Sequence, residues 1–583
     1  MSYEAPLGEI AFLLRTLTPL ASVCALPSCA HTDADMIHAV IEQAAKVARD
    51  IAAPLNAVSD REGARLENGR VTTPPGFPKA YAQLAADGWT SLAAPLEHGG
   101  QALPQLVNTI VAELFSGACV AFQMALLTGS PAAKVIAAHA SQELKNLWLP
   151  QLADGSSTAT IVITEPQAGS DVGLVRTRAQ RREDGTYGLT GTKIFISQGD
   201  HDLAEQILHV VIARTPEGAP GSRGLSLFLV PKRLLDNEGR PGAANGVRAA
   251  RLEHKMGLKG SPTCEMVFED ATGYLVGKEG EGLRNLFAMM NAMRLDVGAQ
   301  SVGVASAALR KALLYVHDRR QGGADADGKP VPIVRHPDVR RTLMAMRVWT
   351  DGMRALLYTA AWHEDMAQGL TDREAAARSM HLVGWLLPLI KAGASEAAST
   401  VASQAIQLHG GHGYVSDHGV EQYARDARVF AIYEGANAIQ ANDLVMRKLT
   451  RAEGETFRHF AALIRADIEA AAGDGRLVEM TAALTHSLEA LEQASAYMLA
   501  RPASADAHAG APIYMQLAIN VAVGWMWLKM ASAERESPDA DLRALHARFF
   551  AAHVLVDSDA LARRAMLGAA LLDEAAPERL VAW

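Results

Sequence analysis

Apolar positions recur at helical intervals along the first quarter of the chain. From Asp33 to about Pro150 a single stripe is visible in Ile37, Ile41 and Ala44, and the stretches PPGFPKAYAQLAADGW and LPQLVNTIVAELFSG repeat it with Pro and Gly between them. This spacing predicts a set of helices that each bury one face.

The spacing of the apolar residues changes in the second quarter of the chain. Between Thr158 and about Phe268 the apolar residues fall in short β-branched runs bounded by Gly, Pro, Asp or Asn: TATIVITEP, YGLTGTKIFIS, ILHVVIART and GLSLFLVP. Such runs are typical of an antiparallel barrel or sandwich.

Helical spacing returns at Gly282 and continues to about Leu449, with a polar, glycine-bearing insertion from Gly322 to Pro332 that we expect to be a surface loop. An alanine-rich helical segment follows. We predict a multidomain α+β protein with four parts: an N-terminal helical domain (1–157), a middle antiparallel β-barrel or sandwich domain (158–280), a helical-bundle domain (281–450) and a C-terminal helical extension (451–583).

Composition narrows the class of protein. The chain has 583 residues, of which 49% are hydrophobic and 20% charged, so a large buried core is expected. The formal net charge of -9 argues against a nucleic-acid partner. The four cysteines are too sparse for a disulfide framework and have no histidines at zinc spacing, which favours reduced thiols in a cytoplasm. The N-terminus lacks a basic leader, and no stretch offers about 20 unbroken apolar residues, so we expect no signal peptide and no integral membrane segment.

The stretch RDARVFAIYEGANAIQ, residues 425–440, carries the candidate for chemistry. We interpret Glu434 as a catalytic base on the turn that leads into a helix, with burial among Phe430, Ile432 and Tyr433 raising its pKa toward neutrality. Asn437 as N-cap and Gln440 three residues later would form a capping box at the start of that helix. The alternative is an ordinary surface glutamate in a turn.

Three motifs give the chain a family resemblance. The strings TEPQAGSD (164–171), LHGGHGY (408–414) and YEGANAIQ (433–440) resemble, in the same order, the signatures of the acyl-CoA dehydrogenase family. The extension beyond Arg451 is similar to that of the long branch of the family, which includes 3-methylmercaptopropionyl-CoA dehydrogenases.

The resemblance implies a bound FAD. The cofactor-binding positions that it carries over are the strand Ile161, Val162, Ile163 and Thr164; the run Phe195, Ile196 and Ser197; Arg319 at the pyrophosphate; and Gln407, Gly410, Gly411, Ala436 and Asn437. Phe195 stands where many members have tryptophan, and Ala436 stands where the family often has a threonine that touches FAD.

The resemblance also implies substrate contacts at Ser170, Arg294 and Gly435, while Arg294 could instead form an ion pair with Asp296 or Glu281. Some family members place the base just before the arginine; Met293 stands there and cannot accept a proton, which favours Glu434, with Asp296 as the second carboxylate. The cluster Met289, Met290 and Met293 is by default a core stripe, or else lines the acyl pocket.

A metal site, an esterase and a dinucleotide-binding fold would each need further residues that the sequence does not contain. His409 and His412 have no further ligands at metal spacing, so we expect ordinary loop histidines and no metal site. HGGHG is similar to an esterase oxyanion loop, but the chain has no GxSxG, and no GxGxxG follows a strand.

We therefore expect an FAD-dependent oxidoreductase that converts an acyl-CoA thioester to the trans-2-enoyl-CoA. An electron-transfer flavoprotein would be the acceptor, and the enzyme would be a cytoplasmic homodimer or homotetramer. The alternatives are an acyl-CoA oxidase that uses dioxygen and a non-enzymatic acyl-CoA-binding scaffold that has lost the flavin. Acyl chain length and branching are left open.

Overall fold

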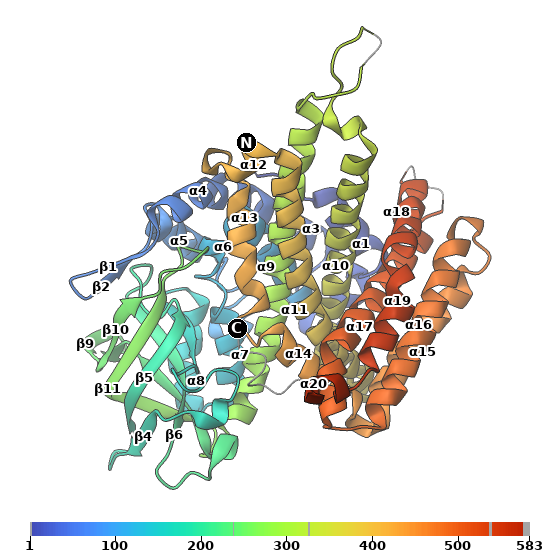
Figure 1. Cartoon of the computed structure of the whole chain (residues 1–583). Helices are drawn as coiled ribbons and strands as arrows, with labels where there is room; N and C mark the ends of the chain where they lie inside the picture. Colours follow the sequence, from blue (N-terminus) through green and yellow to red (C-terminus); the bar gives the residue numbers. More distant parts are fainter. Residues whose placement is uncertain (1–2, 237, 325–326, 536–538, 575–583) are drawn as a thin grey trace. The chain divides into compact units, whose positions relative to one another are not determined.

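The computed structural model describes residues 3–236, 238–324, 327–535 and 539–574. It contains two compact units, one comprising residues 1–5 and 35–296, the other residues 6–34 and 297–583. Each unit is described by itself below, and Figure 1 labels the elements of both. The predicted four-part division stays a prediction, although the structure groups residues 6–34 with the helices of the second unit.

The helices of the first unit precede its sheet in the sequence. The predicted stripe on α3 is confirmed, since Ile37, Ile41 and Ala44 are buried. These helices are α3 (Ala34–Val47), α4 (Ala53–Glu62), α5 (Phe77–Ala86), α6 (Gln105–Gln123), α7 (Gly129–His139) and α8 (Gln142–Ala153). A small antiparallel hairpin, β1 (Arg65–Glu67) and β2 (Arg70–Thr72), lies between α4 and α5 in the sequence.

The middle of the first unit is the β domain expected from the sequence. Its strands are β3 (Ser157–Val162), β4 (Arg178–Arg181), β5 (Tyr187–Ser197), β6 (Gln206–Arg214), β7 (Leu225–Pro231), β10 (Val247–Leu252) and β11 (Thr263–Val276), with a separate ribbon of β8 (Arg233–Leu235) and β9 (Pro241–Ala244). The pairings β11–β5, β5–β4, β4–β6, β6–β7 and β7–β11 close a ring, so the sheet is a barrel (Figure 1).

The barrel departs from the prediction in one respect. Its pairs are antiparallel except for β3 with β6, which is parallel over six residue pairs, and the single parallel pair between β4 and β6. The barrel core is built from inward-facing apolar side chains, among them Leu189, Phe228, Met266 and Phe268.

The second unit is helical. Its longest described helices are α9 (Gly282–Asp318), which begins in the first unit, α10 (Pro337–Gly369) and α11 (Arg373–His409); α10 and α11 run side by side (Figure 1). Shorter elements follow: α12 (Gly411–Tyr414), α13 (Glu421–Ala427), α14 (Asn437–Asp443), α15 (Glu455–Ala471), α16 (Val478–Leu499), α17 (Ala505–Ala533), α18 (Ala540–His553), α19 (Ser558–Ala565) and α20 (Ala570–Glu574).

Helix α17 is the core of the C-terminal part. Trp527 is fully buried and donates its indole N–H to the carbonyl of Val348 on α10, 2.9 Å away. The N-terminal helices α1 (Leu7–Thr16) and α2 (Leu20–Cys24) also belong to this unit: Arg543 on α18 lies 3.3 Å from the ring centroid of Phe12 and pairs with Glu9 at 2.9 Å. The N-terminal segment and the C-terminal extension therefore share one core.

The insertion after α9 is an exposed loop at its described residues. Its ends are joined by main-chain hydrogen bonds, from Gln321 N–H to the carbonyl of Val331 and from Val331 N–H to the carbonyl of Gly322. The expectation of a surface loop is confirmed there; residues 325–326 lie outside the described residues.

Two of the described helices, α6 and α17, are long and apolar enough to cross a membrane by length and composition alone. Their most apolar windows are 89% and 83% buried within the protein. This burial is what core helices show.

Candidate active site

The end of β3 carries the first group of predicted cofactor residues. Ile161, Ile163 and Thr164 are half-buried, whereas the side chain of Val162 is fully buried in the barrel core. The carbonyl of Thr164 accepts the N–H of Ile194, which fixes the end of β3 against β5. The Val162 side chain faces the barrel core, so we expect any contribution of this residue to cofactor binding to come from its main chain.

A bulge on β5 turns Phe195 outward. Cys264 pairs with Ile196 and Met266 pairs with Lys193, so two residues of β5, Ile194 and Phe195, face one residue of β11. Phe195 adopts a left-handed φ of 60° and is 60% exposed. Ile196, in contrast, is buried in the barrel core, and Ser197 is half-buried. The bulge exposes the aromatic ring of Phe195, while the Ile196 side chain packs in the barrel core.

A buried ion pair holds the loop that begins at Thr164. Lys193 and Glu165 have side chains 0% and 3% exposed and meet at 2.9 Å. The lysine also donates to the carbonyls of Ile163 and Ile212, each at 2.8 Å, and the glutamate accepts the hydroxyl and N–H of Thr177. This cluster, Lys193–Glu165–Thr177, is called the β-domain clamp below.

Charge compensation decides the protonation of the β-domain clamp. Burial raises the pKa of Glu165, but the nearby Lys193 and the hydrogen bonds from Thr177, Lys193 and the Arg176 N–H outweigh it and lower the pKa to about 2. Burial lowers the pKa of Lys193 to about 8 against the opposing effect of Glu165. Both groups are thus charged at neutral pH.

Sequence reasoning missed the β-domain clamp, although a signal existed. Lys193 occupies an inward position of a strand whose alternating neighbours are apolar or small, and a charged residue there requires a buried partner. Further along the same loop, the predicted substrate residue Ser170 is exposed.

The turn around Glu434 is strained and tied down through its main chain. Glu434 has a φ of 54° and Gly435 a φ of 85°, in the region that only glycine adopts without cost. The side-chain amide of Gln440 donates to the carbonyls of Glu434 and Gly435, each at 3.1 Å. Both bonds use main-chain oxygens and leave the position of the turn fixed from beneath.

The predicted capping box is wrong. Helix α14 begins at Asn437 with Ala436 as its N-cap residue, and no side chain caps it. The Asn437 amide oxygen instead accepts from Lys391 on α11, and its amide nitrogen donates to Ser395 and Glu396 of the same helix. The Gln440 amide donates to the carbonyls of the turn. The helix does continue to Leu449, as predicted, through a π-helical segment, Leu444–Leu449.

The predicted burial around Glu434 is confirmed only in part. Phe430 is fully buried, Tyr433 is half-buried with its hydroxyl donating to Gln300, and Ile432 is 56% exposed, contrary to expectation. Glu434 itself is half-buried, as are Gly435 and Ala436. The carboxylate therefore belongs neither to the core nor to a fully exposed loop.

The predicted pyrophosphate and adenosine residues lie at one end of the helical unit. Arg319 is exposed just after α9 and donates to Gln321, while Gln407, Gly410 and Gly411 are exposed at the end of α11. Tyr315 on α9 stacks on His409 of α11 with ring centroids 4.2 Å apart, so the two helix ends are adjacent.

His409 and His412 make ordinary contacts. His409 bonds the carbonyl of Ala405, and burial lowers its pKa; His412 bonds the hydroxyl of Tyr315 at 2.9 Å. Among the residues that the structure describes, no group of three or more His, Cys, Asp or Glu could hold a metal ion. The four cysteines are free thiols.

On α9, Arg294 is 4% exposed and Asp296 is 5% exposed. Met289 and Met293 are buried, as in a core stripe, and Met290 is half-buried. The roles of Arg294 and Gly435 toward a substrate stay predictions.

The sequence matches the acyl-CoA dehydrogenase family along most of its length. The N-terminal domain of the family matches residues 37–156, the middle domain residues 160–271 and the C-terminal domain residues 280–449, and an acetyl-CoA dehydrogenase C-terminal-like domain matches residues 460–574. The chain belongs to the acyl-CoA dehydrogenase family and is an oxidoreductase that acts on acyl-CoA.

Two relatives place the chain within this family. The 3-methylmercaptopropionyl-CoA dehydrogenase of Ruegeria pomeroyi is 41% identical over 96% of this chain and 97% of its own. The broad-specificity linear acyl-CoA dehydrogenase FadE5 of Mycobacterium tuberculosis is 34% identical over 84% of this chain and 83% of its own. Among solved structures, ACDH-11 of Caenorhabditis elegans in complex with C11-CoA has a TM-score of 0.77 and covers 95% of this chain and 92% of its own at 22% identity, which shows a shared fold.

Acyl-CoA dehydrogenases are FAD-dependent, and the residues of this chain fit that cofactor. In the first unit, the half-buried Ile161, Ile163 and Thr164 and the outward ring of Phe195 are an apolar, aromatic surface suited to a flat heteroaromatic ring. In the second unit, the exposed guanidinium of Arg319 suits a pyrophosphate.

Proposed function

We propose that the protein catalyses α,β-dehydrogenation of an acyl-CoA thioester to the trans-2-enoyl-CoA, with Glu434 as the base that removes the α proton. The observation that supports this proposal is the turn itself. A half-buried glutamate in a left-handed conformation, tied through its main chain by Gln440, is costly to maintain for structure alone.

The chemistry assigns separate tasks to the residues. FAD, when bound, would supply the acceptor for the β hydrogen, which leaves the substrate as hydride. Glu434 would accept the α proton, and its backbone N–H would donate to the thioester oxygen as negative charge develops there. A donor of this kind is worth about 3 kcal/mol in comparable sites. The role of Gln440 would be to hold the Glu434 main chain, and with it that N–H, in one orientation.

The relatives indicate which acyl groups to test. The Ruegeria relative is named for a thioether acyl group and the Mycobacterium relative for linear acyl groups, so a panel of both kinds is appropriate. We propose an acceptor of the electron-transfer flavoprotein class, a homodimer or homotetramer, and a cytoplasmic location. Comparing re-oxidation of the reduced flavin by air and by such a flavoprotein separates a dehydrogenase from an oxidase.

Replacing the proposed base tests the mechanism. Glu434→Gln keeps the shape of the side chain but cannot accept the proton, and we expect anaerobic flavin reduction by the best acyl-CoA of the panel to slow by about 10³-fold. FAD content and acyl-CoA binding should stay within about twofold of the wild type, since a neutral isostere changes few contacts. Stopped-flow absorbance of the flavin measures the rate.

The exposed Glu455 at the start of α15 offers a matched control. Glu455→Gln makes the same chemical change and should reduce flavin at the wild-type rate. Wild-type reduction by Glu434→Gln would place the base at another residue. A purified wild-type protein that is colourless and cannot be reconstituted with FAD would favour the scaffold alternative.

A further inference from the structure

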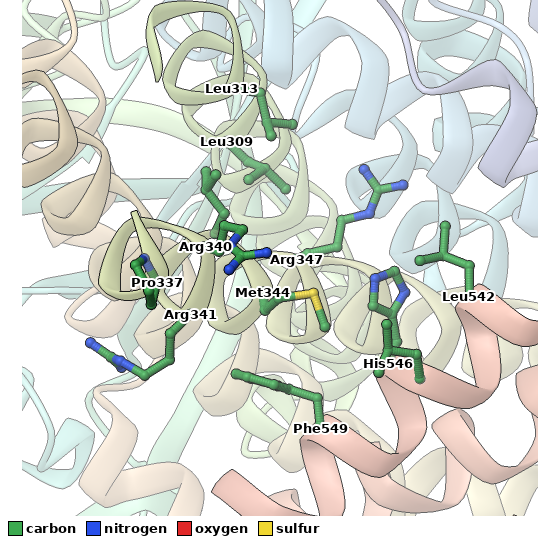
Figure 2. A pocket seen from close by; sticks show the side chains of 12 residues that line it. Leu309, Leu313, Pro337, Arg340, Arg341, Met344, Arg347, Leu542, His546 and Phe549 are labelled. Carbon is green, nitrogen blue, oxygen red and sulfur yellow. The ribbon is translucent and has the colours of Figure 1, made fainter. Parts of the chain in front are cut away.

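A pocket of about 630 Å³ lies within the helical unit, between α9, α10 and α18. Its floor is apolar, with Leu309 from α9, Met344 from α10 and Phe549 from α18 among the lining side chains (Figure 2). None of the residues proposed for catalysis or for FAD lines it. The volume falls in the range of small-molecule sites, roughly 300–1,000 Å³.

The charged residues of this pocket are all cationic. Arg340, Arg341 and Arg347 line it, and no carboxylate does. Arg347 is paired with Asp351 at 2.5 Å. Arg340 and Arg341 are exposed and form no ion pair among the residues that the structure describes. Two guanidinium groups beside the apolar floor are thus left without a counter-charge.

The remaining polar features do not cancel this charge. Burial lowers the pKa of His546 to about 4 despite the opposing effect of Asp351, so the imidazole is neutral at pH 7 and can only exchange a hydrogen bond. The first turn of α10, which begins at Pro337, also faces the pocket and adds partial positive charge. Asp338 lies on that turn but is exposed and does not line the pocket.

Figure 2 shows how these groups are arranged. Met344 and Phe549 lie between Arg341 on one side and Arg347 with His546 on the other, so the apolar floor has an unpaired guanidinium at one edge and the ion-paired Arg347 with the neutral imidazole at the other. A bound molecule would therefore need an apolar body long enough to cover the floor and an anionic end to meet a guanidinium.

We propose that this pocket binds an amphipathic anion, an apolar chain that ends in a carboxylate or phosphate. The apolar floor accounts for the chain, and the unpaired Arg340 and Arg341 account for the charged end. The site is separate from the proposed base, so this inference does not depend on the proposed function. A free fatty acid and an alkyl phosphate share this chemistry, whereas in an acyl-CoA a neutral thioester and the pantetheine arm separate the chain from the phosphates.

Calorimetric titration of the FAD-loaded, full-length protein tests the proposal with decanoate as the first probe. Two variants change the two parts of the site separately. Arg340→Glu/Arg341→Glu reverses the charges, and Leu545→Trp places a larger side chain in the apolar part of the pocket. Each variant should raise the Kd for decanoate at least about tenfold. Charge reversal removes a charge-assisted hydrogen bond to the carboxylate, and the tryptophan occupies the space of the apolar chain. Uncharged decanol should bind more weakly than decanoate to the wild type.

A matched control uses two exposed arginines of α11 outside the pocket. Arg373→Glu/Arg378→Glu makes the same change in net charge and should bind decanoate like the wild type. Decanoyl-CoA and decyl phosphate then distinguish the source of the anion: whichever head group is weakened most by Arg340→Glu/Arg341→Glu is the one that the arginines bind.

Three outcomes would overturn the proposal. Equal decanoate binding by the wild type and both pocket variants would place the ligand elsewhere, for example at the catalytic site. Weakening by charge reversal but not by Leu545→Trp would reduce the effect to surface charge. The third outcome is that the wild type binds none of the probes. If light scattering then gives a lower oligomeric mass for Leu545→Trp than for the wild type, a second copy of the chain covers the pocket.

Discussion

Two stretches carry the predicted chemistry, and they are held in place by opposite means. The loop after β3, which begins at Thr164, depends on a buried ion pair with neutral hydrogen bonds around it. The turn at Glu434 depends on two residues in the left-handed conformation and on one amide side chain beneath them. The first uses a buried ion pair to fix a surface, and the second uses backbone geometry and neutral amide hydrogen bonds to its main-chain carbonyls.

The difference follows from what each stretch would do. A surface that only binds a cofactor tolerates a buried cation and anion nearby, because their charges cancel. The turn of the proposed base is held by neutral hydrogen bonds from Gln440 to the carbonyls of Glu434 and Gly435, which fix its main chain without using the Glu434 carboxylate.

Removing one charge of the β-domain clamp should have the largest effect. Lys193→Met leaves Glu165 buried without its cation, and we expect a loss of about 3–5 kcal/mol in the free energy of unfolding, measured by urea titration. The double variant Lys193→Met/Glu165→Gln should recover part of this loss. As control, Arg248 pairs with Glu269 on the same barrel with both side chains more than half exposed, and Arg248→Met should cost under about 1 kcal/mol. Equal losses for both lysine and arginine variants would contradict the account.

The second largest effect is expected from acid, which should weaken the β-domain clamp by protonating Glu165. The folded-state pKa of Glu165 is about 2 and its ordinary value is 4.5, so the carboxylate contributes stability above pH 4.5 that is lost as the pH falls toward 2. The contribution amounts to about 3 kcal/mol. Urea titrations at intervals from pH 5 to pH 2 should show a steeper loss for the wild type than for Lys193→Met/Glu165→Gln. Parallel curves would mean that Glu165 is not the group that titrates.

Loosening the turn should cost less stability but more activity. Gln440→Leu removes both hydrogen bonds to the carbonyls of Glu434 and Gly435, and we expect a loss of about 1–2 kcal/mol. Flavin reduction should slow about tenfold, since a small misplacement of a base is costly, while FAD content is retained. Gln516→Leu, a change of a half-buried glutamine on α17, is the control and should leave the rate unchanged. A wild-type rate in Gln440→Leu would show that the turn is held by other means.

The smallest effect is expected at the N-cap of α14. Ala436→Thr introduces a hydroxyl where the helix has no side-chain cap, which should raise stability by about 0.5–1 kcal/mol. By the family resemblance the same hydroxyl would also slow FAD loss during dialysis. Ala436→Val has nearly the same shape without the hydroxyl and should give neither gain. A gain with valine would indicate packing rather than capping.

Much of the fold was predictable because it depends on local periodicity. The strands β3, β5, β6 and β7 fall on the β-branched runs, and α3 falls on its apolar stripe. The parallel pairing of β3 with β6 was not predictable in this way, because strand direction depends on chain crossings rather than on side-chain alternation.

The location of Glu434 was predictable, but the geometry around it was not. Gly435 and the helical spacing through Val445 and Leu449 placed Glu434 in a turn before a helix, and the structure agrees. The capping box failed because Asn437 and Gln440 had stronger partners outside their own helix turn, on α11 and in the preceding turn. The outward rotation of Phe195 and inward burial of Ile196 arose from a bulge, which inserts a residue without a distinctive sequence.

The packing of Phe12 and Glu9 against Arg543 has a consequence for biosynthesis. On the ribosome, the segment that follows the N-terminus emerges first, yet its partner on α18 is translated more than 500 residues later. The cluster around Val23 can pack earlier, against Trp362 and Met366 of α10, whereas the ion pair between Glu9 and Arg543 forms only after α18 has been translated.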